Sequence, residues 1–189
     1  WRMPSRRPAG DRLGKLHGQT LRIPVQQLRQ LREWRLVRLL ELKLPPPFLA
    51  LLLAAAMWGV SHFEPRFAIP AVVRWPVAGV LALVGATFDI LGLLAFRRSR
   101  TTVDPFKPHR ASVFVASGVY KVTRNPMYLG LLFVLLGWAV FLGSLWPFLA
   151  PMFFVPYVDR FQIKPEELAM ARLFGESYAN YTAKVPRWL

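Results

Sequence analysis

Cysteine is absent from this 189-residue chain. Its absence excludes a disulfide framework, a thiolate metal site and a cysteine nucleophile. Histidine is also scarce, and the spacing of the three histidines fits no metal-binding motif, so we predict no metal site. These residues are His17, His62 and His109.

Acidic residues are few as well: 10 Asp and Glu stand against 25 Lys and Arg, which gives a formal net charge of +15. Such an excess would suit a nucleic-acid partner, but the basic residues are unevenly distributed. Residues 1–45 hold eleven Lys and Arg against three acids, and residues 97–124 hold seven against one. Short loops rich in Lys and Arg stay in the cytoplasm. The charge therefore indicates membrane topology, with both termini cytoplasmic and no nucleic-acid partner.

Long apolar runs account for much of the chain, in which 54% of residues are hydrophobic. Four runs approach or reach the roughly 20 residues that cross a bilayer core, and Gly143-Ser144 between the last two permits a tight hairpin. We predict an all-α integral-membrane helical bundle with about four transmembrane helices, in a bacterial inner membrane. The predicted spans are about 47–63, 76–96, 126–142 and 145–161.

The segment before the first span, residues 1–44, forms a basic N-terminal extension. From residue 25 to 44, apolar residues recur at helical spacing with arginines beside them. This pattern predicts a basic amphipathic helix on the membrane surface, with anionic lipid as its partner. The alternative is a solvated extension that packs on nothing in particular.

Two polar motifs flank the last apolar hairpin. The first is GVYKVTRNPMYLG at 118–130, and the second is RFQIKPEEL at 160–168, followed by FGESYANY at 174–181. Since the hairpin between them is apolar, both motifs meet at one membrane face. Their order and spacing resemble the isoprenylcysteine carboxyl methyltransferase family, whose signature reads G-x-Y-x-x-x-R-[H/N]-P-x-Y-x-G, then a Glu pair, then F-G-x-x-Y-x-x-Y. Phospholipid N-methyltransferases are relatives of that family.

The resemblance implies a membrane methyltransferase domain over residues 45–189. Pro165 suits the first turn of a helix, where the dipole favours Glu166 and Glu167, so we predict a cytoplasmic helix at about 165–184. The resemblance also implies S-adenosyl-L-methionine (SAM) as the cofactor. Glu166 matches the family glutamate that contacts SAM, and Val115 falls in a stretch that lines the pocket. The other implied cofactor-binding residues are Tyr120, Asn125, Pro126, Met127 and Tyr128.

The chain departs from the family pattern at two positions. Asn125 stands where eukaryotic members have His, and Asn cannot titrate near neutral pH. Gln162 stands where they have an arginine that suits a carboxylate acceptor. Gln162 and the nearby Arg160 are therefore the candidate substrate-binding residues, and a prenylcysteine acceptor is in question.

The second predicted span contains one carboxylate, Asp89. Intramembrane carboxylates are costly and usually functional, so Asp89 is a candidate catalytic residue. Arg160, beside the second motif, is the other candidate. The alternative is a structural Asp89 that faces the bundle.

We expect a methyltransferase that moves a methyl group from SAM to a lipophilic acceptor entering from the bilayer. It resembles protein-S-isoprenylcysteine carboxyl O-methyltransferases. The alternatives are a phospholipid N-methyltransferase, a small-thiol S-methyltransferase or, from another class, a non-enzymatic membrane protein.

Overall fold

The computed structural model describes residues 44–63, 69–98 and 115–189, which fall within one compact unit, Val37–Leu189. These residues form helices and turns and no strand, which confirms the all-α class. The predicted amphipathic helix at 25–44 lies outside the described residues except for its last residue, as does most of the polar loop before Val115.

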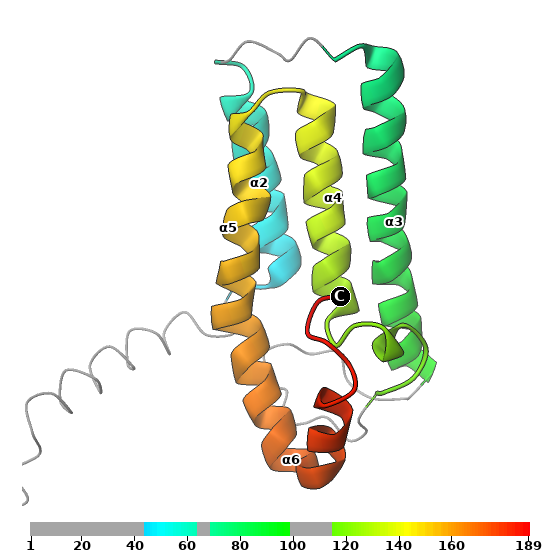
Figure 1. Ribbon diagram of the computed structural model, residues 1–189. Helices are drawn as coiled ribbons and strands as arrows, with labels where there is room; N and C mark the ends of the chain where they lie inside the picture. The colour runs from blue at the N-terminus through cyan, green and yellow to red at the C-terminus, as the bar shows by residue number, and fades with distance from the viewer. Residues whose placement is uncertain (1–43, 64–68, 99–114) are drawn as a thin grey trace, which may run out of the picture. The chain divides into compact units, whose positions relative to one another are not determined.

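Five α-helices make up the described part of the chain (Figure 1). They are α2 (Pro46–Val60), α3 (Ala71–Arg98), α4 (Pro126–Leu142), α5 (Leu149–Val158) and α6 (Lys164–Thr182). Two 3₁₀ turns, η2 (Gly118–Lys121) and η3 (Trp146–Phe148), precede α4 and α5, and a π-helical turn, η4 (Asp159–Ile163), joins α5 to α6.

The helix boundaries match the predicted spans unevenly. α4 has the predicted bounds because Pro126 starts it, and Gly143 ends it in the left-handed conformation at φ 68°. The predicted span at 145–161 differs: it opens with a 3₁₀ turn around Pro147 and continues without interruption through η4 into α6. The predicted cytoplasmic helix is thus the continuation of α5.

α3 and α4 form the most closely packed helix pair of the described residues, and glycines make this possible. A Cβ added to Gly85 would lie 2.6 Å from the carbonyl oxygen of Gly130, and one on Gly130 would lie 2.7 Å from that of Gly85. Gly137 and Gly92 make similarly close approaches to the opposite helix. Small residues that let backbones approach are typical of helix pairs in membranes.

The other face of α4 contributes to an apolar core shared with α2, α5 and η4. Phe154, Val158 and Ile163 are fully buried in it, and Leu135 and Ala139 meet them from α4. Trp138 adds a polar tie, since its indole N–H donates to the carbonyl of Ala54 at 3.0 Å. α4 therefore lies between α3 and the α2–α5 side of the bundle.

The chain reverses direction inside α6, at Gly175. Its φ of 48° and ψ of −122° are open essentially to glycine alone. Figure 1 shows the last helical segment turning back from the end of the α5–α6 helix, with the C-terminus at the foot of α4. The predicted cytoplasmic helix is therefore two short helices, and the reversal returns the C-terminal tail to the first motif.

Much of the surface of these helices is apolar. Among the described helices, α3 is the one long and apolar enough to cross a membrane, and α2 and α4 are shorter apolar helices. Large apolar side chains are exposed along α3, including Val72, Leu83 and Ile90. One side of α3 therefore has no packing partner among the described residues.

Candidate functional site

A hydrogen bond between the two motifs defines the candidate site. The Tyr128 hydroxyl on α4 donates to Glu166 Oε1 on α6 at 2.6 Å. Burial raises the pKa of Glu166 to about 7; the bond from Tyr128 opposes this rise, and the charge of Glu167 adds to it. Glu166 is therefore a largely buried carboxylate that titrates near neutral pH.

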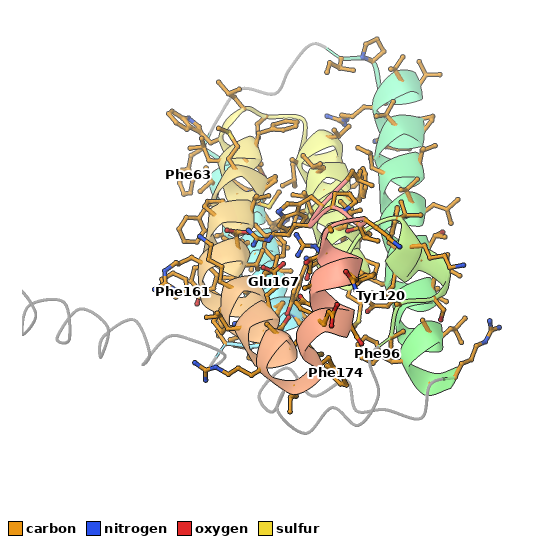
Figure 2. All side chains as sticks on the ribbon, turned by 60° about the horizontal axis from the view of Figure 1, so that its bottom comes forward. Phe63, Phe96, Tyr120, Phe161, Glu167 and Phe174 are labelled. Atoms are coloured by element: carbon orange, nitrogen blue, oxygen red, sulfur yellow. The ribbon has the colours of Figure 1, made fainter. Side chains whose placement is uncertain are left out.

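The neighbouring glutamate has a different environment. Glu167 Oε1 lies 2.9 Å from Arg124 Nη1 and accepts a bond from Arg187 Nε at 3.1 Å, while its Oε2 accepts one from Arg187 Nη2 at 2.5 Å. Figure 2 shows Glu167 close to the returning half of α6. Two guanidinium groups thus compensate Glu167, whereas no cation of the described residues pairs with Glu166.

The Arg-Asn-Pro segment holds the C-terminal tail. The backbone N–H of Arg124 donates to Pro186 O at 3.0 Å, and Asn125 Nδ2 donates to Arg187 O at 2.9 Å. The Thr123 hydroxyl donates to the same carbonyl at 3.1 Å and accepts the backbone N–H of Asn125 at 3.2 Å. Asn125 precedes α4, but its side chain does not cap the helix, because the tail engages it instead.

Tyr120 links the turn before α4 to the returning half of α6. Its ring meets Phe96 edge-on, with centroids 5.5 Å apart, and its carbonyl accepts the Tyr181 hydroxyl at 2.7 Å. Burial raises the pKa of Tyr120, and the Glu166 charge contributes to the rise. Tyr120, Tyr128 and Glu166 therefore share one electrostatic neighbourhood.

Three predicted cofactor residues contribute less through their side chains. Val115 is buried, and Pro126 is fully buried at the start of α4. Met127 packs on α3, where its Cγ lies 2.8 Å from a Cβ built on Gly92. The side chain of Met127 thus points to a different face of α4 from that of Tyr128.

The candidate substrate residues lie on the π turn. Gln162 is 1% exposed, and its Nε2 donates to the Leu44 carbonyl at 2.9 Å. Its Oε1 has no partner among the described residues. The guanidinium carbon of Arg160 lies 5.5 Å from the Phe161 ring centroid.

Asp89 lies apart from the Tyr128–Glu166 pair. Its carboxylate packs directly on Gly130 in the α3–α4 interface. Gly130 and Met127 occupy the side of α4 that faces α3, whereas Tyr128 faces α6. The structure therefore places Asp89 on the same side of α4 as Met127 and apart from the Tyr128–Glu166 pair.

Four further residues complete the site: Glu167, which the sequence indicated only as the second residue of the Glu pair, and Thr123, Asp159 and Arg187, which were not predicted as site residues. Asp159 on η4 accepts from Arg187 Nη1 at 2.8 Å. Arg187 follows no motif and lies 62 residues from its hydrogen-bond partner Asn125. No periodicity or spacing in the sequence indicates this contact; its one signal is a polar arginine between Pro186 and Trp188.

The sequence is similar to proteins of two organisms. A stretch of 63 residues is 41% identical to an uncharacterised protein of Haemophilus influenzae, covering 33% of this chain and 100% of that protein. Over 83 residues, which are 42% of this chain, the sequence is 31% identical to the protein-S-isoprenylcysteine O-methyltransferase of Schizosaccharomyces pombe. The chain spans 34% of the length of that enzyme. No solved structure matches the chain.

The family model for phospholipid methyltransferases matches residues 73–177. This range includes all but the first two residues of α3, all of α4 and the Tyr128–Glu166 pair, and it ends before the tail that carries Arg187. The match and the similarity to the isoprenylcysteine enzyme confirm the family resemblance seen in the sequence. The chain belongs to the phospholipid methyltransferase family, whose relatives include isoprenylcysteine-type methyltransferases.

Proposed function

We propose that this protein is an integral-membrane methyltransferase that transfers a methyl group from SAM to a lipophilic acceptor. The observation that carries the proposal is the contrast between two adjacent glutamates. Glu167 is compensated by two arginines, whereas Glu166 receives only the Tyr128 hydroxyl among the described residues. A buried carboxylate without a cation is suited to a cationic ligand.

The residues around Glu166 fit SAM, which supplies an electrophilic methyl group on a sulfonium. Glu166 would contact the cationic part of the cofactor, with Tyr128 holding the carboxylate in place. Tyr120, Asn125 and Val115 would line the rest of the pocket. Methyl transfer by in-line displacement depends on alignment, which is worth roughly 7–11 kcal/mol of the barrier. The displacement itself needs no acid or base from the protein; a carboxylate acceptor loses no proton, whereas an amine or thiol acceptor releases one to water.

The distribution of side chains supports a membrane location. Trp58, Trp75 and Trp146 are exposed at one end of the bundle, where α2 ends, α3 begins and η3 lies. Arg97 and Arg98 end α3 at the other. Aromatic belts and basic cytoplasmic boundaries are typical of membrane proteins. We propose that α2, α3, α4 and α5 with η3 are the four spans.

Labelling of single cysteines tests this topology, and the chain needs no cysteine removed first. An impermeant thiol reagent added to intact cells should label Ile69→Cys, which precedes α3 at the tryptophan end. It should reach Lys184→Cys, beyond α6, only after the membrane is permeabilised, because basic termini stay in the cytoplasm. Labelling of Lys184→Cys in intact cells would refute the topology.

The environment of Gln162 bears on the acceptor class. Gln162 carries no charge, is almost fully buried, and has one amide hydrogen bound to the Leu44 carbonyl, so it cannot form the bidentate ion pair that an arginine would make with an acceptor carboxylate. This observation favours a phospholipid amine or a thiol over a prenylcysteine carboxylate. In each case the acceptor would enter from the bilayer, and anionic lipid would be the partner of the basic residues 1–44.

The proposed activity predicts cofactor binding by the wild-type protein. Calorimetry on the full chain in detergent micelles should show that S-adenosylhomocysteine, the demethylated product, binds with 1:1 stoichiometry. A well-folded protein that binds neither this product nor SAM would refute the methyltransferase function. Mass spectrometry of lipids and thiols after overexpression would then identify the methylated acceptor.

A further inference from the structure

The C-terminal tail is held against the candidate site by its own main chain. The Pro186 and Arg187 carbonyls accept three hydrogen bonds from Thr123, Arg124 and Asn125. Val185 is buried, and Trp188 packs against the apolar core of the bundle. The position of the Arg187 side chain is thus fixed from both sides.

From this position Arg187 bridges two helical elements. Its Nε and Nη2 bind the two oxygens of Glu167 on α6, and its Nη1 binds Asp159 on η4 at 2.8 Å. The planar guanidinium fork matches a carboxylate bidentately, which makes such pairs strong and specific in geometry. The carboxylates of Glu167 and Asp159 raise the pKa of Arg187, which therefore stays charged.

The electrostatic surroundings of Glu166 make this pairing important. Among the residues that the structure describes, the groups that face Glu166 are Tyr128 from α4, Tyr120 from η2, and Tyr178 and Glu167 from α6 itself. None of these is a cation. The negative charge of Glu167 opposes ionisation of Glu166, so the net charge left on Glu167 determines how readily Glu166 ionises.

We propose that Arg187 is a positioning residue of the methyl-transfer site. Together with Arg124 it neutralises Glu167, so that Glu166 carries the negative charge that meets the cationic cofactor. The inference rests on the proposed function and assigns the tail, which lies beyond the family match, a part in that function. Arg187 acts through Glu167 and does not itself touch the reacting atoms.

The test is the pH dependence of S-adenosylhomocysteine binding, measured by calorimetry on the full chain in detergent micelles between pH 6 and about 9. We compare Arg187→Gln with Arg187→Lys and with Lys184→Gln, which removes an exposed cation that has no ion-pair partner among the described residues. The ligand ionises identically in every experiment, so the ratio of variant to wild-type affinity at each pH reports only the effect of the substitution.

An uncompensated like charge typically shifts a neighbouring pKa by about one unit or more. Arg187→Gln should therefore weaken binding up to about tenfold at pH 7 and recover towards wild-type affinity near pH 9, where Glu166 ionises again. Arg187→Lys should keep most of the wild-type pH profile, and Lys184→Gln should match wild type throughout. Arg124→Gln should shift the profile in the same direction as Arg187→Gln, which provides a second variant should Arg187→Gln fail to fold.

A loss of affinity by the same factor at every pH would show that the tail is only structural and would overturn the proposal. An unchanged profile in both arginine variants would overturn it as well. These results leave the proposed function intact, since wild type still binds the ligand. Absence of binding by wild type would instead refute the proposed function.

Discussion

Replacing Glu166 by glutamine is expected to weaken the binding of SAM and S-adenosylhomocysteine by about tenfold to a hundredfold. Hydrogen bonds to charged groups are worth roughly 1.5–3 kcal/mol, and the amide keeps the shape of the carboxylate while removing its charge. Tyr128 can still donate to the amide oxygen, so the local structure should persist. Calorimetry in detergent micelles measures the loss.

Glu176→Gln is the matched control, because Glu176 is an exposed residue beyond the reversal at Gly175. It makes the same chemical change on the same helix and should leave the affinity unchanged. Equal losses in the two variants would indicate a general effect of charge. Wild-type affinity in Glu166→Gln would show that the cofactor binds elsewhere.

At alkaline pH and without ligand, Glu166→Gln should be more stable than wild type. Since burial raises the pKa of Glu166 from 4.5 to about 7, the folded state binds its proton more tightly than the unfolded state. The favourable contribution of protonated Glu166 is full below pH about 4.5 and is lost as pH rises through about 7. Thermal melts should therefore show Glu166→Gln gaining on wild type at pH 8 and matching it near pH 5.

Gly130→Ala should destabilise the protein, by about 1–3 kcal/mol as is typical of overpacked cores. The new methyl group would lie 2.7 Å from the carbonyl oxygen of Gly85 and would collide with the Asp89 carboxylate. The carbonyl belongs to a helix backbone, so it can move only if α3 moves away from α4. Thermal unfolding in detergent micelles, followed by circular dichroism, measures the effect.

Gly79→Ala in α3 is the control, because a Cβ at Gly79 meets nothing within 4 Å. There the change only removes backbone freedom from the unfolded chain, which should stabilise the helix by up to about 1 kcal/mol. The two substitutions are chemically identical and should act with opposite sign. A stable Gly130→Ala variant would contradict the close helix contact.

The sequence predicted best those features that depend on local signals. Pro126 begins α4 because the backbone N–H that proline lacks has no partner in the first turn of a helix. Gly143 ends α4 because it adopts a left-handed conformation. The resemblance pointed to both Tyr128 and Glu166, but their hydrogen bond depends on tertiary structure. No local pattern around either residue indicates that the two form a hydrogen bond.

Pro165 lies in the first turn of α6, as the sequence predicted, but α6 is not separate from α5. A proline often begins a helix, so the sequence favoured a separate cytoplasmic helix from residue 165. In the structure the residues before it form the π turn, in which the N–H of Lys164 bonds the carbonyl of Asp159, five residues back. The altered ladder accommodates the proline without ending the helix. The reversal at Gly175 was not predicted, because the FGESYANY motif contains no proline or Asn-Gly pair that would indicate it.

The π turn has a consequence for how this family can diversify. A π turn holds one more residue than an α turn, so removing one residue from Asp159–Ile163 would restore an α-helix with nearly unchanged orientation on both sides. Arg160 and Gln162 would shift, whereas Glu166 would keep its direction toward Tyr128. Insertions and deletions here can thus change the positions of Arg160 and Gln162 while the hydrogen bond between Tyr128 and Glu166 remains.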